Sequence, residues 1–103
     1  MITPCGAERY KMQFEWDEYK SLKNLEKHKI SFDIVHYLFN DSMLVAVDDR
    51  KDYGEIRYTA YSLYDDCLFN VVYTERNNKI RIISVRKANE REKARYKAAI
   101  RSC

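Results

Sequence analysis

The sequence predicts an α+β fold with two N-terminal helices, a four-stranded antiparallel sheet that one short edge strand could extend, and a C-terminal helix. Three observations lead to this prediction. Apolar residues recur at helical spacing up to residue 39, and from residue 43 they alternate with a period of two. The last three alternating segments are joined by short links rich in Asp and Asn. The chain has 103 residues, of which 46% are hydrophobic, with only two Gly and one Pro, as expected of one globular domain.

The first eleven residues differ from the rest of the chain. They show no periodicity and contain the only proline, Pro4. We therefore expect a disordered extension at residues 1–11 and a single folded domain over residues 12–103. The patterned part opens with Gln13 to Trp16, a candidate for the short edge strand.

The first helix is predicted to run from Asp17 to about His28. Asp17 is a favourable N-cap, because its carboxylate can accept hydrogen bonds from the free N–H groups of the first turn. Tyr19, Leu22 and Leu25 recur at helical spacing and form one apolar stripe.

A second short helix is predicted to follow, capped by Ser31 and stopped by Asn40 and Asp41. Its inner face is expected to consist of four apolar residues: Phe32, Val35, Leu38 and Phe39.

Four segments are then predicted to be strands: Met43 to Val47, Ile56 to Leu63, Cys67 to Glu75 and Lys79 to Arg86. A charged loop over residues 48–54 joins the first two. The other connections are the short links 64–66 and 76–78, whose Asp and Asn residues tolerate left-handed backbone conformations. Short links between consecutive strands require antiparallel pairing.

The last third of the chain is strongly basic. Residues 76–101 carry a net charge of +8, whereas the remainder carries −5. Asn89 and Glu92 form a capping-box pair that opens a helix from Glu90 to about Ile100. A basic strand followed by a basic helix suits a phosphate backbone. The competing interpretation is a solvated charged face with no ligand.

Strict alternation along the last strand places Ile80, Ile82, Ser84 and Arg86 on one face and Arg81, Ile83 and Val85 on the other. Four charged residues fall near strand ends: Arg57, Glu75, Arg81 and Arg86. We expect them to converge in one cleft at the rim of the sheet, where guanidinium groups can grip phosphate through paired hydrogen bonds. The alternative for Glu75 and Arg81 is a cross-strand ion pair.

Composition argues against several classes of site. The three cysteines, Cys5, Cys67 and Cys103, are far apart and show no CxxC or Cys/His spacing. We therefore expect no disulfide framework, no metal site and no cofactor, and we expect a cytoplasmic location. No apolar run approaches the ~20 residues of a membrane span.

Six stretches, taken in order, carry a family resemblance: Phe14-Glu15-Trp16-Asp17, Asn24-Leu25-x-Lys27-His28, Gly54-Glu55-x-Arg57, Val72-Tyr73-Thr74-Glu75-Arg76, Arg81-Ile82-Ile83-Ser84-Val85-Arg86 and Ala88-x-x-x-Arg91-Glu92-x-x-x-Tyr96. Together they resemble the BrnT-type ribonuclease toxins of bacterial type II toxin–antitoxin systems, from about Met12 to Tyr96. The chain departs from the family pattern at Lys29, where glycine is usual, at Tyr73, where histidine is frequent, and in the loop 48–54, which lacks a histidine.

The resemblance implies a RelE-like fold and metal-independent RNA cleavage through attack of the ribose 2′-OH on the adjacent phosphate. Such chemistry needs a base, an acid and cations that stabilise the developing charge. On this interpretation Glu75 is the general base, and His28 is suited to proton transfer. The three arginines expected to bind phosphate and stabilise the transition state are Arg57, Arg81 and Arg86.

Five further residues are candidates for contacting RNA: Lys27, Arg76, Lys79, Lys87 and Tyr73. Each functional assignment has a structural alternative. His28 could complement the helix dipole, and Tyr73 could be ordinary strand packing. We expect His36 to be structural or exposed, and Trp16 to anchor the core.

The resemblance also implies a partner, a BrnA-type ribbon-helix-helix antitoxin, for which the basic C-terminal helix would suit an acidic segment. DNA would then be bound only through the toxin–antitoxin complex. Two other functions remain open at this point. One is a non-catalytic nucleic-acid-binding module, and the other is a pure protein-interaction domain.

Overall fold

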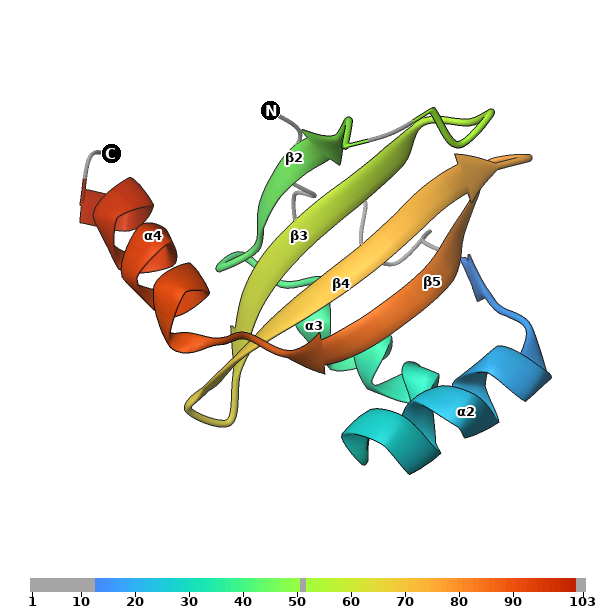
Figure 1. Cartoon of the computed structure of the whole chain (residues 1–103), viewed down its shortest axis with the longest axis horizontal. Helices are drawn as coiled ribbons and strands as arrows, with labels where there is room; N and C mark the ends of the chain where they lie inside the picture. Colours follow the sequence, from blue (N-terminus) through green and yellow to red (C-terminus); the bar gives the residue numbers. More distant parts are fainter. Residues whose placement is uncertain (1–12, 51, 102–103) are drawn as a thin grey trace.

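The computed structural model describes residues 13–50 and 52–101. Five strands form one sheet in the order β1-β5-β4-β3-β2, and two helical layers pack against it (Figure 1). The strands are β1 (Phe14–Glu15), β2 (Leu44–Asp48), β3 (Arg57–Tyr64), β4 (Cys67–Arg76) and β5 (Lys79–Lys87). The helices are α2 (Glu18–His28), the 3-10 turn η1 (Phe32–Ile34), α3 (Val35–Leu38) and α4 (Glu90–Arg101). The extension predicted at residues 1–11 lies outside the described residues.

The α+β class is confirmed, but the sheet is mixed rather than purely antiparallel. Strands β2 to β5 are antiparallel neighbours, as predicted from the short links between them. The short edge strand β1 runs parallel to β5, with Phe14 opposite Ile80 and Glu15 opposite Arg81. No tight turn joins these two strands, and so nothing in the connection requires antiparallel pairing.

Both predicted tight turns are confirmed. The β3–β4 link places Asp65 and Asp66 at φ values of 53° and 62°, and the β4–β5 link places Asn77 and Asn78 at 52° and 63°. Two consecutive left-handed residues match the right-handed twist of the flanking strands. Asp and Asn adopt this conformation more readily than other non-glycine residues. The turns therefore fix the register of the central hairpins.

The main core lies between one face of the sheet and the η1–α3 segment. The four apolar residues predicted for this segment are all buried: Phe32, Val35, Leu38 and Phe39. They pack against Val71, Ile82 and Val85 of the sheet. The segment is helical as predicted, but it divides into a 3-10 turn and one α-helical turn. Ser31 stands at the N-cap position without a side-chain hydrogen bond, so the predicted side-chain cap was wrong.

Helix α2 begins as predicted, because the Asp17 carboxylate accepts hydrogen bonds from the N–H groups of Tyr19 and Lys20. Its orientation is unexpected. The apolar stripe faces outward, with Tyr19, Leu22 and Leu25 exposed by 66%, 61% and 43%. The buried side of the helix is polar.

Asn24 explains why the polar side of α2 is buried. Its amide nitrogen donates to the carbonyls of Ile30 and Val85 at 2.8 Å, and its amide oxygen accepts from the N–H of Val85 at 3.3 Å. Strand β1 pairs only with the first part of β5, so Asn24 satisfies the edge of β5 where β1 has ended. Ser21 adds a hydrogen bond from the N–H of Phe32.

The end of α2 accommodates the departure noted at Lys29. This residue is left-handed, with φ 62° and ψ 29°, and its N–H donates to the carbonyl of Leu25 at 2.9 Å. The geometry is the one a helix-terminal glycine usually provides. Lysine therefore takes a glycine role here at some conformational cost.

A bulge in β5 changes which residues share a face. Val72 lies opposite Ser84 and the next residue, Tyr73, lies opposite Ile82, so Ile83 is an extra residue in β5. Arg81 consequently lies on the same face as Ser84 and not with Val85. The strict alternation predicted for this strand was wrong at this point.

Helix α4 packs over one end of the opposite sheet face. The predicted capping box is present: the N–H of Asn89 donates to Glu92 Oε1 at 2.9 Å, and the N–H of Glu92 donates to Asn89 Oδ1 at 2.8 Å. Tyr96 is buried against Leu68 and Ala88 in a small second cluster. Over residues 13–50 and 52–101, no helix is long and apolar enough to cross a membrane.

Candidate nucleic-acid interface

The face of the sheet opposite the core presents three cross-strand rows over β3, β4 and β5. In Figure 1 this face lies away from α3, and α4 stands at one of its ends. The rows, read from the strand register, are Arg57–Thr74–Arg81, Thr59–Val72–Ser84 and Tyr61–Asn70–Arg86. We call these nine residues the open face. Eight of them are polar or carry a polar group, whereas the alternate residues of the same strands form the core.

The three predicted arginines therefore share the open face. Arg57 and Arg81 flank Thr74, two strand spacings apart, which corresponds to roughly 10 Å. Arg86 lies in the row nearest α4. The bulge at Ile83 is what brings Arg81 to the side that holds the other two arginines.

Each of these arginines also has an acidic neighbour. Arg57 Nε lies 3.5 Å from Glu55 Oε2 and forms no hydrogen bond, and its guanidinium stacks on the Tyr53 ring at 4.1 Å. Arg81 Nη1 lies 3.5 Å from Glu15 Oε2. Both ion pairs are long and partly exposed, so an anionic ligand can compete for these guanidinium groups.

Arg86 makes the strongest contact on the open face. Its two terminal nitrogens donate to the two carboxylate oxygens of Glu92 at 2.8 and 2.7 Å. Tyr61 Oη donates to Glu92 Oε2 at 2.8 Å. Since the capping box also uses Glu92, one carboxylate connects the β5 arginine, the β3 tyrosine and the start of α4.

A polar furrow of about 440 Å³ lies over two of the three rows. Its walls combine the middle and last rows with residues from β2, the following loop and α4. The residues outside the open face are Val47, Asp48, Asp49, Arg50, Glu92 and Arg95. Arg57 and Arg81 stand on the same face just beyond it. The furrow therefore offers cations, hydroxyl groups and carboxylates to one extended ligand.

Ion pairing sets the protonation of the furrow. The Arg86 hydrogen bonds hold the pKa of Glu92 at about 2, against the opposing effect of burial. The Arg50 guanidinium, 2.8 Å from Asp48 Oδ1, likewise lowers the pKa of Asp48 to about 2. Burial, and then the neighbouring Glu92 carboxylate, raise the pKa of Tyr61. At neutral pH both carboxylates are ionised and the phenol is protonated.

Glu75 does not join the arginines. It lies opposite Ile80, on the side of β4 that carries Tyr73, and it is exposed near the end of the strand. The expected single cleft containing Glu75 and the arginines is therefore not what the structure contains. The alternative ion pair between Glu75 and Arg81 is also absent from the described residues, where Arg81 is paired with Glu15.

Tyr73 is part of the core. It is 8% exposed, its ring stacks on Tyr58 at 5.2 Å, and it makes an edge contact with Phe39 at 5.3 Å. Burial raises its pKa strongly. Little of the ring remains for a nucleic-acid base.

The two histidines lie away from the furrow. His28 is the last residue of α2 and is partly exposed. None of the contacts described for residues 13–50 and 52–101 joins it to Arg57, Arg81 or Arg86. His36 is exposed and makes edge contacts with the Phe14 and Trp16 rings. Trp16 packs against the core, as expected.

The predicted RNA-contacting cations are exposed and dispersed. Arg76 and Lys79 lie opposite each other at the β4–β5 turn, and Arg76 is bound by Glu55 at 2.8 Å. Lys27 lies on α2. Lys87 ends β5 and lines a different groove, described below.

Sequence reasoning missed the polar residues between the arginines. Asn70 is 2% exposed and donates to Thr59 Oγ1 at 2.8 Å. Glu92 accepts hydrogen bonds from both Tyr61 and Arg86. Glu92 was recognised as a helix cap and as part of the C-terminal family stretch, but not as a partner of Arg86. A polar Asn in the middle of the apolar β4 segment was the available signal, because a buried amide needs polar neighbours.

The comparisons with known proteins identify the family of the chain. The family model for the ribonuclease toxin BrnT of type II toxin–antitoxin systems matches residues 16–92, which include all three arginines and Glu92. No curated protein matches the chain. The matched segment covers most of the chain and the whole open face. The chain therefore belongs to the BrnT family of ribonuclease toxins of type II toxin–antitoxin systems.

Proposed function

We propose that this toxin is a metal-independent endoribonuclease of the cytoplasm that cleaves RNA on the open face by attack of a ribose 2′-OH. Cleavage inhibits translation and growth. A BrnA-type ribbon-helix-helix antitoxin neutralises the toxin, and DNA is bound only through that complex. The observation that best supports this cleavage site is that Arg57, Arg81 and Arg86 share one sheet face, the one opposite the core, within the segment that matches the family.

The phosphate is held by the arginines. A guanidinium group can donate two parallel hydrogen bonds to phosphate, and Arg86 already presents both terminal nitrogens in that manner to Glu92. Arg57 and Arg81, whose acidic neighbours are at 3.5 Å, bind adjacent phosphates or the developing negative charge. Arg76 and Lys79 extend the cationic path at the hairpin end, and Lys27 and Lys87 are peripheral.

Proton transfer is supported best at Glu92. A scissile phosphate that takes over Arg86 removes the hydrogen bonds that hold the pKa of Glu92 at about 2. That pKa then rises toward its ordinary value, and the carboxylate becomes a stronger base for the 2′ proton. Tyr61, protonated and 2.8 Å from Glu92, is placed to donate a proton or hydrogen bond. Glu75 and His28 remain the competing candidates from the sequence.

The test is cleavage of a defined RNA by the purified toxin in excess EDTA. We expect cleavage to persist, and Arg86→Ala to reduce its rate at least about 100-fold, as loss of a transition-state donor does. Arg86→Lys should recover little of the lost cleavage rate, because an ammonium group cannot make the paired contact with phosphate. Glu26→Gln on the exposed side of α2 is the matched control and should cleave normally.

Different outcomes would redirect the proposal. A larger loss in Glu75→Gln than in Glu92→Gln would return the base role to Glu75. Intact RNA that is nevertheless bound, with an affinity that falls steeply with salt, would identify a binding module without catalysis. A requirement for added metal would contradict the metal-independent mechanism.

A further inference from the structure

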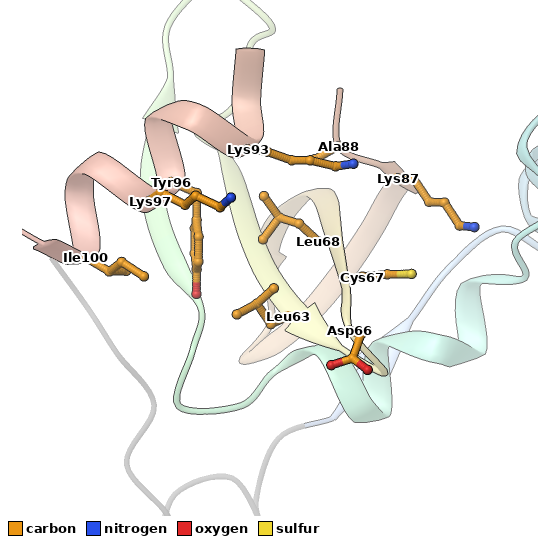
Figure 2. Close-up of a pocket in the computed structure, with 10 residues that line it drawn as sticks. All are labelled: Leu63, Asp66, Cys67, Leu68, Lys87, Ala88, Lys93, Tyr96, Lys97 and Ile100. Atoms are coloured by element: carbon orange, nitrogen blue, oxygen red, sulfur yellow. The ribbon is translucent and has the colours of Figure 1, made fainter. Parts of the chain in front are cut away.

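A second groove lies on the other side of α4 (Figure 2). It has a volume of about 400 Å³ and separates α4 from the end of the β3–β4 hairpin. Its lining consists of six mainly apolar residues (Leu63, Cys67, Leu68, Ala88, Tyr96 and Ile100) and four charged ones (Asp66, Lys87, Lys93 and Lys97). We call this hollow the apolar groove.

The apolar groove has the character of an unfilled protein interface. Leu63 and Ile100 are 42% and 45% exposed on its two sides, although both are large aliphatic residues. Tyr96 is the only buried residue of α4, so the helix leaves much of its inner side for another contact. A surface hollow lined by apolar side chains is where a partner places its anchoring residues.

Charge narrows the identity of the occupant. Three lysines and one aspartate give the groove a net charge of +2. Lys93 and Lys97 are one helical turn apart on α4, and Lys87 is contributed by the end of β5. Carboxylates spaced along a peptide can meet these ammonium groups while apolar side chains enter between them. RNA has no comparable aliphatic groups, and the polar furrow offers it better partners.

We propose that the apolar groove is the docking site for an acidic amphipathic segment of the antitoxin. The inference rests on the proposed function, since a type II toxin is neutralised by a protein. It goes further by assigning the interface to one side of α4. The partner inserts aliphatic side chains between Leu63 and Ile100, and its carboxylates pair with Lys93 and Lys97.

This placement separates neutralisation from cleavage. Glu92 and Arg95 line the polar furrow, whereas Lys93, Lys97 and Ile100 line the apolar groove. One helix about 10 Å across therefore carries the RNA surface on one side and the antitoxin surface on the other. A segment anchored in the groove reaches the furrow by crossing α4, so the two activities can be lost independently.

The experiment uses the full-length toxin and the products of the two reading frames that flank its gene, each purified separately. Ile100→Glu and Lys97→Glu each place a negative charge in the groove. We expect each to weaken binding at least 30-fold, measured by calorimetry, and to abolish rescue of growth on co-expression. RNA cleavage by both variants should equal that of the unmodified toxin. Leu22→Glu on the exposed α2 stripe is the matched control and should bind normally.

Two further measurements distinguish loss of the interface from unfolding and locate the bound partner. Thermal melts of Ile100→Glu and the milder Lys97→Ala establish that weaker binding is not caused by unfolding. Binding of the partner should also slow alkylation of Cys67, which lines the groove, as followed in its own peptide by mass spectrometry.

Normal binding by Ile100→Glu and Lys97→Glu would overturn the inference while leaving the nuclease proposal intact. Loss of binding in Leu22→Glu alone would move the interface to α2. Failure of both adjacent gene products to bind would also overturn it.

Discussion

The two faces of the central strands use the same backbone for different purposes. On the core face, Val71, Ile82 and Val85 are almost completely buried against η1 and α3. On the open face, the alternate positions carry Arg57, Arg81 and Arg86 beside hydroxyl and amide groups. The strands thus hold the fold together with one set of residues and present charge with the other. Stability and RNA binding should therefore respond to different substitutions on one strand.

The largest expected effect tests this separation on β5. Ile82→Ala should lower the free energy of unfolding by about 3 kcal/mol, because it leaves a cavity in a tightly packed core. Ser84→Ala, two positions along on the open face, should change it by no more than about 0.5 kcal/mol. Urea denaturation measures both. Equal losses in the two variants would contradict the division between the faces.

A second substitution tests whether burial, rather than apolar character, decides how much a residue contributes to the free energy of unfolding. Asn24 is polar but 8% exposed, and it binds both backbone groups of Val85. Asn24→Ala should destabilise the protein by about 2 kcal/mol, since it leaves buried backbone groups without partners. Leu22→Ala on the outward stripe should be nearly neutral in the same denaturation experiment. If Leu22→Ala cost more than Asn24→Ala, the orientation assigned to α2 would be wrong.

The third prediction concerns the ion pair between Arg86 on the open face and Glu92 of α4, which also supports the fold. The pKa of Glu92 lies at about 2, below its ordinary value of 4.5. Its contribution is therefore complete above about pH 4.5 and is lost as the pH falls toward 2. Glu92→Gln should cost about 1–2 kcal/mol at pH 7, and this difference should disappear near pH 2. Unfolding curves across that range measure it. A difference independent of pH would show that the ion pair with Arg86 contributes no net stability.

Much of the fold could be predicted from the sequence because local signals specify it. Asp17, the capping pair Asn89 and Glu92, and the two Asp and Asn turns all act within four residues of where they stand. These elements appear where expected, and the ends of strands β2 to β5 lie within about one residue of the predicted ends.

The remaining features depend on contacts that local patterns do not contain. The stripe on α2 has an amphipathic spacing, but the unpaired edge of β5 selects the Asn24 side for burial. Likewise, only the cross-strand register identifies Ile83 as an extra residue. The three arginines share the open face, whereas Glu75, expected beside them, lies on the other side of β4, because alternation within one strand cannot relate that strand to the next. Whether Glu75 and His28 act in catalysis stays a prediction.

The extra residue at Ile83 has a consequence for the evolution of this surface. Arg81 and Arg86 are separated by five positions, an odd number, which in a regular strand would send their side chains to opposite sides. The bulge returns both arginine side chains to the same face of the sheet. A relative that straightened this strand without also losing one residue would have to turn one guanidinium toward the hydrophobic interior. Relatives should therefore gain or lose the bulge together with the five-residue spacing between the two arginines.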